Sequence, residues 1–138
     1  MMKIEINRES APVHFVASNE DGNTISIDGS EAIGGAGKGM RPMQVVLGAL
    51  GTCSCFDIVE ILKKQRQDLQ DIKITVTAER ADAVPAPFTA IHLHFRLWGE
   101  LDENKVSRAI DLGVNKYCSV GVILEKSAKI TYTFEINP

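Results

Sequence analysis

The longest helical pattern in the chain, residues 42–66, constrains the fold more than any other segment. Its sequence is PMQVVLGALGTCSCFDIVEILKKQR, and Pro42 suits the first turn of a helix. A helix of about 25 residues would be roughly 37 Å long at 1.5 Å per residue. From Val45 to Val59 apolar or small residues occur on nearly every side, which predicts a central, buried helix. The rest of a chain of 138 residues can hardly cover such a helix, so we expect a symmetric homodimer.

Two glycines interrupt this helical pattern. Gly48 and Gly51 each cost about 1 kcal/mol relative to alanine in a helix interior. We expect the close approach of another backbone to compensate for this cost, at a crowded contact of the central helices in the dimer.

The remaining patterns predict strands and one further helix. Strands are expected over residues 2–6, 13–17, 24–28, 72–79, 88–98 and 129–136. The further helix begins with Asp102 as N-cap and places four apolar residues on one face, namely Val106, Ile110, Val114 and Tyr117. Because helices and strands are segregated along the chain rather than alternating, the fold class is α+β. We expect one domain, residues 1–138, in which N-terminal strands and a glycine-rich connection (1–40) precede a helix–strand–strand–helix–strand body (41–138).

Composition and charge argue against several partners and locations. The net charge of −3 disfavours a nucleic-acid partner, which would need a basic surface. No run of about 18 apolar residues occurs, so we expect no membrane partner and no membrane span. The first residues, MMKIEINRES, lack the apolar core of a signal peptide. Three cysteines without signs of secretion favour a reducing, cytoplasmic location, where a transient catalytic disulfide can form but a lasting one is disfavoured.

The motifs give little support to phosphate binding or serine hydrolysis. Residues 29–40 contain five glycines, but Lys38 precedes another glycine, and this spacing is not that of a P-loop. We interpret the segment as a mobile connection to the long helix. No G-x-S-x-G motif is present, so a serine hydrolase is not indicated.

A metal site is also not indicated. Cys53 and Cys55 stand two residues apart on a helix, which points their side chains about 200° apart, so one ion cannot bind both. His92 and His94 share one face of a strand, but no third ligand is evident, and an exposed polar face explains them as well. We therefore expect neither a metal nor a cofactor.

The thiols remain as candidates for chemistry. A cysteine on an apolar helix is most often an inert core residue, and we assign Cys55 this role. Cys53 lies in the middle of the long helix, and Cys118 lies where the second helix ends. A helix end can approach a helix middle within the roughly 7 Å between Cα atoms that a disulfide requires.

Four stretches of the chain resemble the OsmC/Ohr family of osmotically inducible and organic-hydroperoxide-resistance proteins. They are RPMQVVLGALGTCSCFDIVEILKK, IKITVTAER, FTAIHLHFRLWG and VSRAIDLGVNKYCSVGVIL. The most specific features are the spacing from Pro42 to Cys53 and the hydroxyl residue that follows Cys118. The resemblance implies an intertwined α+β homodimer, in which antiparallel sheets pack around two long central helices.

The resemblance also implies a chemistry. In catalytic members of the family, the first cysteine attacks an organic hydroperoxide as a thiolate. The second cysteine then resolves the sulfenic acid as a disulfide, which an external dithiol reduces. By position, Cys53 matches the first cysteine and Cys118 the second.

The sequence departs from the peroxidase pattern at two positions. Met43 follows the helix-opening proline where family peroxidases carry a glutamate, and the N-terminal turn DGNTIS lacks their arginine. Arg41 and Arg80 are the cations available to stabilise a Cys53 thiolate, and we take Arg41 as the candidate. Two functions follow: thiol-dependent reduction of a small apolar hydroperoxide, or a non-catalytic dimer that binds small molecules in the family's pocket.

Overall fold

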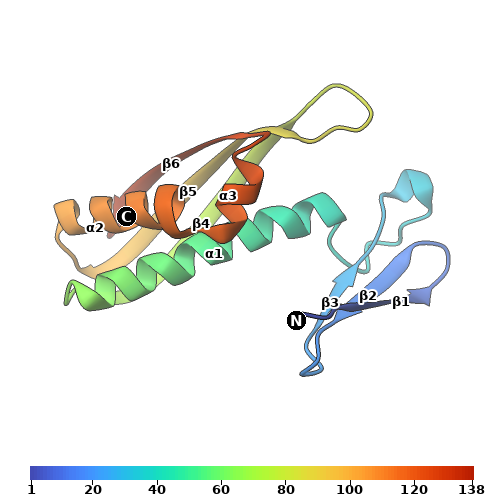
Figure 1. Cartoon of the computed structure of the whole chain (residues 1–138), viewed down its shortest axis with the longest axis horizontal. Coiled ribbons are helices and arrows are strands. Elements are labelled where there is room, and N and C mark those ends of the chain that lie inside the picture. Colours follow the sequence, from blue (N-terminus) through green and yellow to red (C-terminus); the bar gives the residue numbers. More distant parts are fainter. The chain divides into compact units, whose positions relative to one another are not determined.

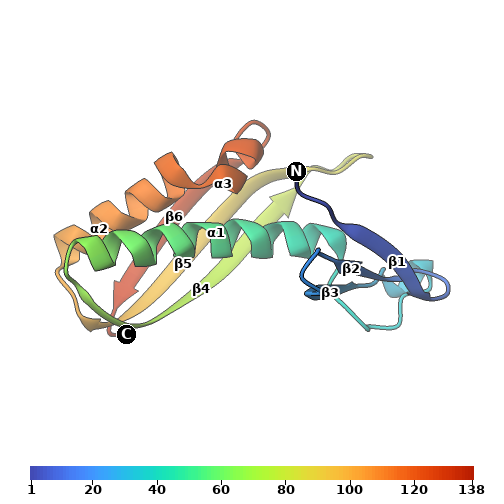
Figure 2. The same cartoon turned by 60° about the horizontal axis from the view of Figure 1, so that its bottom comes forward.

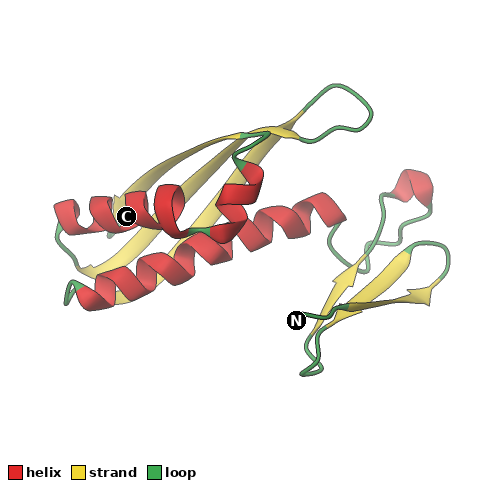
Figure 3. Cartoon of the chain, in the orientation of Figure 1, coloured by secondary structure: helices red, strands yellow, loops and turns green.

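The structure is a computed structural model that describes all residues from Met1 to Pro138 (Figure 1). Its elements in chain order are β1 (Glu5–Ser10), β2 (His14–Ser18), β3 (Thr24–Ile27), the short 3-10 helix η1 (Glu31–Ile33), α1 (Pro42–Lys64), β4 (Asp68–Arg80), β5 (Phe88–Glu100), α2 (Glu103–Leu112), the π-helical turn η2 (Gly113–Tyr117), α3 (Ser119–Leu124) and β6 (Lys129–Ile136). Strands and helices are segregated (Figure 3), which confirms the predicted α+β class.

The chain divides into two compact units, Met1–Leu47 and Gly48–Pro138. The boundary between these units lies inside α1, and the residues directly before this helix are tied to the N-terminal sheet. Met40 forms an isolated parallel bridge with Ile27, and its carbonyl accepts the Asp28 N–H at 3.0 Å.

The N-terminal unit is an antiparallel meander in the order β1-β2-β3. The first strand begins at Glu5, three residues later than the alternation from Met2 predicts. Ile4 and Ile6 remain exposed in this chain, so the apolar positions of that alternation face no core here. The alternation is therefore a poor guide to where β1 starts.

The C-terminal unit is built on the sheet β4-β5-β6. Strands β4 and β5 form a long antiparallel hairpin, but β5 and β6 are parallel. This corrects the expectation of wholly antiparallel sheets. The helical segments between β5 and β6 cross one face of the sheet and return the chain to the end from which β5 started (Figure 2).

Helix α1 is covered on only part of its surface within the chain. Leu50, Ile58 and Leu62 are at most 1% exposed and form its buried face in the C-terminal unit. Phe56 is 75% exposed and Val59 is 42% exposed. The prediction of a helix buried on nearly every side is therefore wrong for the single chain.

The same helix is long and apolar enough, by length and composition alone, to cross a membrane. It meets this criterion although it contains no uninterrupted run of 18 apolar residues, because small uncharged residues interrupt the run without adding charge. The core helix of a soluble protein passes the same test, so the result does not by itself indicate a membrane span.

The two glycines of α1 differ in their surroundings. A Cβ atom on Gly51 would lie 3.1 Å from Val76 Cγ2 and 3.6 Å from Ile74 Cδ1, both on β4. A Cβ on Gly48 would meet nothing within 4 Å. Within the single chain, close approach therefore occurs at Gly51 alone, and it involves side chains of the sheet. The contact expected between the two central helices of a dimer stays a prediction.

Helix α2 begins as predicted. The Asp102 side chain accepts the Lys105 N–H at 3.0 Å, which confirms the expected N-cap. Val106, Ile110 and Val114 are buried, whereas Tyr117 is 52% exposed. Tyr117 leaves the apolar face because the π-helical turn η2 changes the helical period after Leu112. Helix α3 was not among the predicted elements.

Candidate functional site

Cys118 is held at the start of α3 by its own side chain. Its sulfur caps this short helix and accepts the Gly121 N–H at 3.2 Å. The Cys118 S–H in turn donates to the carbonyl of Leu50 on α1, with 4.0 Å between sulfur and oxygen. Cys118 is 1% exposed, so this thiol is almost completely enclosed.

The Cys53 side chain is the neighbour of this buried thiol. Cys53 is half-buried on α1, and all three cysteines of the chain are free. Its thiol lies close enough to that of Cys118 to raise the pKa of the Cys118 thiol. The structure therefore brings together the two cysteines that the resemblance pairs, one accessible and one enclosed. Their chemical roles stay a prediction.

Burial raises the pKa of the Cys118 thiol above its ordinary value, and the neighbouring Cys53 thiol raises it further. The Gly121 N–H and the Ser54 hydroxyl have the opposite effect on the pKa, since each favours the charged sulfur. Cys118 is consequently a protonated thiol at neutral pH, with donors already in place beside it.

Cys55 differs from the other two cysteines. It is half-buried on α1, and burial raises the pKa of its thiol to about 11. A thiol with such a pKa carries almost no thiolate at neutral pH. These surroundings agree with the packing role expected for this residue.

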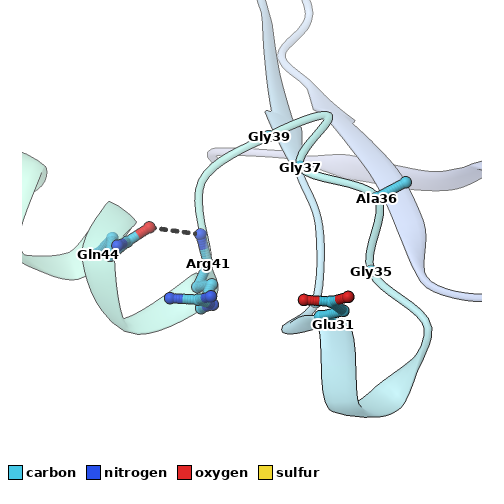
Figure 4. Close-up of a pocket in the computed structure, with 8 residues that line it drawn as sticks. Glu31, Gly35, Ala36, Gly37, Gly39, Arg41 and Gln44 are labelled. Atoms are coloured by element: carbon cyan, nitrogen blue, oxygen red, sulfur yellow. Dashed lines mark hydrogen bonds between the residues drawn. The ribbon is translucent and has the colours of Figure 1, made fainter.

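Arg41 lies in the N-terminal unit, directly before α1. Its backbone N–H donates to Gln44 Oε1 at 2.9 Å, so Gln44 closes the first turn of the helix as in a capping box (Figure 4). Its guanidinium makes no ion pair. Arg80, the other available cation, donates its Nε–H to the Ala86 carbonyl at 2.9 Å within the β4–β5 connection.

Arg41 and Gln44 line a cavity of about 590 Å³ (Figure 4). Its other walls are formed by residues of the glycine-rich segment, namely Gly29, Glu31, Gly35, Ala36, Gly37 and Gly39. The cavity lies wholly within the N-terminal unit. The side chains of Arg41 and Glu31 place opposite charges on its walls, and both are solvent-exposed.

Asp28 gives the glycine-rich segment a defined shape. It is 2% exposed, and its carboxylate accepts the N–H groups of Gly29, Ala36 and Lys38 at 2.8, 3.0 and 3.1 Å. The N–H of Ala36, followed by that of Lys38, lowers the pKa of this carboxyl below its ordinary value. A Cβ on Gly35 would overlap the Gly29 carbonyl oxygen, so the loop requires glycine there.

The segment is thus an organised loop, and the interpretation as a mobile connection is corrected. Asp28 was not among the residues predicted to shape the site. The available signal was an aspartate at the end of a strand, directly before a glycine-rich run, where it can accept several backbone N–H groups.

The two strand histidines are occupied by hydrogen bonds. His92 contacts the hydroxyls of Thr131 and Thr133 at 2.7 and 2.9 Å. His94 contacts Thr133 at 2.7 Å and Glu135 at 3.0 Å. No group of three histidine, cysteine, aspartate or glutamate side chains is arranged to hold a metal ion.

Comparison with known proteins gives the family. The model of the OsmC-like protein family matches residues 35–133. Protein YhfA of Escherichia coli strain K12 is 42% identical over 123 residues, which cover 88% of this chain and 89% of that protein. The chain belongs to the OsmC-like family, and the resemblance recognised in the sequence is confirmed.

Solved structures agree with this assignment. A hypothetical protein from Aquifex aeolicus VF5 is 28% identical, with a TM-score of 0.83 over 100% of this chain and 98% of that one. The organic hydroperoxide resistance protein OhrB of Bacillus subtilis is 13% identical, with a TM-score of 0.70 over 98% of both chains. The second comparison shows a shared fold alone.

Proposed function

We propose that this protein reduces small organic hydroperoxides, with Cys53 as the nucleophile and Cys118 as the resolving thiol. The observation that carries the proposal is that a half-buried thiol, Cys53, lies beside an enclosed one, Cys118. Relatives of the same fold that are called organic hydroperoxide resistance proteins support it.

The reaction has three balanced steps. The Cys53 thiolate attacks the distal oxygen of the hydroperoxide, the O–O bond breaks, and the alkoxide leaves with a proton as the alcohol. The Cys118 sulfur, after losing its proton, attacks the Cys53 sulfenic acid and expels hydroxide, which takes up a proton to form water. An external dithiol then supplies two electrons and reduces the disulfide, which fits a reducing compartment such as the cytoplasm.

The surroundings of Cys53 favour an apolar substrate. Apolar side chains such as Leu50 and Phe56 lie within one turn of it on α1. Cys53 also needs a cation for activation, because the N-terminal turn DGNTIS lacks the arginine of the family's peroxidases. We assign this role to Arg41, whose guanidinium is free of ion pairs.

The proposed active form is a homodimer. In the C-terminal unit, α1 and the segment that includes α3 expose five large apolar side chains, a set that a second subunit would cover. They are Phe56, Val59, Tyr117, Val122 and Ile123. Sedimentation at micromolar concentration should give a dimer, and Phe56→Asp should shift it toward monomer. A parent protein that sediments as a monomer would contradict this part of the proposal.

The decisive experiment follows the thiols. Reduced protein is mixed with one equivalent of cumene hydroperoxide or hydrogen peroxide and monitored by intact mass and free-thiol count. We expect fast loss of two thiols with the organic peroxide and a slower loss with hydrogen peroxide. Cys53→Ser should abolish the reaction, and Cys118→Ser should trap a sulfenic acid.

Two further variants serve as controls. Cys55→Ser should change little, because the Cys55 thiol is protonated at neutral pH and takes no part in the proposed reaction. Arg41→Ala should slow the first step, whereas Arg80→Ala should not, since the Arg80 side chain bonds the Ala86 carbonyl instead. Reaction of Cys53 no faster than that of free cysteine would exclude catalysis.

A non-catalytic binding protein is the second candidate. Met43 in place of the family's glutamate favours it, since this exchange removes one charged group from the pattern of the peroxidases. An inert Cys53 together with saturable binding of a small apolar molecule would support this function over the first.

A further inference from the structure

Ser54 carries a buried hydroxyl whose hydrogen-bonding capacity is unused. The residue is 0% exposed, and its Oγ atom has no hydrogen-bond partner. On the same helix, the Thr52 hydroxyl donates to the Gly48 carbonyl at 2.7 Å, which is the usual solution for a helical hydroxyl. Because buried polar atoms are nearly always paired, the unpaired hydroxyl of Ser54 requires an explanation.

The sulfur of Cys118 lies beside this hydroxyl. It contacts the Leu50 carbonyl, and Leu50 and Ser54 are four residues apart and therefore adjacent on one face of α1. The Ser54 hydroxyl is close enough to lower the pKa of the Cys118 thiol, although no hydrogen bond of normal geometry joins the two atoms. Both residues are enclosed, so solvent cannot take the place of either partner.

The protonation state of Cys118 decides what the hydroxyl can do. As a thiol, Cys118 donates to the Leu50 carbonyl and needs no other acceptor. As a thiolate, it would face the negative end of that carbonyl, with the Gly121 N–H as its one backbone donor. A serine hydroxyl can rotate to donate or accept, so Ser54 can supply a second donor when the charge forms.

We propose that Ser54 is a positioning residue which, together with the Gly121 N–H, holds Cys118 as a thiolate whenever that sulfur attacks or leaves. The role in attack on a Cys53 sulfenic acid rests on the proposed function. The role in which Cys118 leaves as a thiolate does not rest on the proposed function, because any dithiol can reduce a Cys53–Cys118 disulfide.

The difference in exposure sets the direction of this reduction. Cys118 is 1% exposed, so a thiolate of the external dithiol attacks the sulfur of half-buried Cys53. The Cys53–Cys118 bond breaks, and Cys118 leaves as a thiolate that later takes up a proton. The second thiol of the dithiol then attacks the mixed disulfide and releases Cys53, so the dithiol loses two electrons and becomes a cyclic disulfide. A stabilised leaving thiolate speeds the first of these steps.

The test needs no hydroperoxide. In a Cys55→Ser background, the disulfide is formed with diamide, and its reduction by dithiothreitol at pH 7 is followed by quenched mass spectrometry. Ser54→Ala should slow reduction about tenfold. Thr52→Ala, which removes an already paired hydroxyl from the same helix, should leave the rate unchanged.

A second readout separates this role from a structural one. In a Cys53→Ser, Cys55→Ser background, thiolate absorbance at 240 nm reports Cys118, and Ser54→Ala should raise its titration midpoint by about one pH unit. An unchanged reduction rate would overturn the proposal, and so would slower reduction with an unchanged midpoint. If the parent protein does not reduce hydroperoxides but both effects of Ser54→Ala occur, the proposed function fails and the role of Ser54 stands.

Discussion

Replacing Gly51 by leucine tests how tightly α1 packs on the sheet of the C-terminal unit. The Cβ atom of the introduced leucine would already lie 3.1 Å from Val76 Cγ2, with two Ile74 side-chain atoms at 3.6 and 3.7 Å. A contact of 3.1 Å between carbon atoms is well inside the optimal separation of about 3.5–4.0 Å. The remaining leucine atoms would have to enter the layer between α1 and β4.

The expected cost follows from these contacts. Overpacking of a core typically costs about 1–3 kcal/mol, and the gain from replacing glycine in a helix offsets roughly 1 kcal/mol of strain. Because β4 is held in a long hairpin with β5, we expect the sheet to yield little, so that the net loss is about 2 kcal/mol. For a chain of this size, the loss corresponds to a decrease in Tm of roughly 8 °C.

The assay is urea unfolding at a fixed protein concentration, followed by circular dichroism. Gly48→Ala is the matched control on the same helix, since a Cβ there meets nothing within 4 Å. This variant should be as stable as the parent or gain up to about 1 kcal/mol. A Gly51→Leu variant with the stability of the parent would show that α1 and β4 are not tightly packed at this point.

Two further predictions concern residues that hold local structure. Asp102→Ala should lower the free energy of unfolding by about 1 kcal/mol in urea titrations, because the Lys105 N–H loses its acceptor, whereas Asp102→Ser should retain most of the stability. Asp28→Asn should speed amide hydrogen exchange at Ala36 and Lys38, whose N–H groups share one carboxylate oxygen; unchanged exchange would mean that the loop holds its shape without the carboxylate. The pKa of Asp28 is lower in the folded protein than its ordinary value of about 3.9. The carboxylate therefore stabilises the loop fully above about pH 3.9, and this effect is lost as the pH falls through the lowered pKa. Exchange at these amides should accordingly accelerate only in strong acid.

Local patterns predicted most of the elements well. The long helix, the β4–β5 hairpin, the capped start of α2 and the last strand all depend on signals within a few residues, such as Pro42, alternating side chains and Asp102. The predictions failed where distant groups decide the structure. Helix α3 has little amphipathic pattern of its own, and it is stabilised by the Cys118 cap, whose thiol also donates to the Leu50 carbonyl on α1.

The candidate site shows the same division. The sequence pointed to Cys53 and Cys118 through a family resemblance, and the tertiary structure brings their thiols together. Ser54 carried no visible signal, since a serine on an apolar helix usually bonds its own helix backbone. Its importance becomes apparent only when Cys118 occupies the adjacent space.

The sequence by itself determined the α+β class, the identity of the central helix and the family, because these depend on periodicity, on the spacing of residues and on local caps. Only the tertiary structure decided that β6 runs parallel to β5, that Asp28 organises the glycine-rich loop, and that one thiol is enclosed while its neighbour is accessible. The physical reason is that strand direction, burial and pKa arise from groups far apart in the chain. Their contacts form only when the helices close over the sheet.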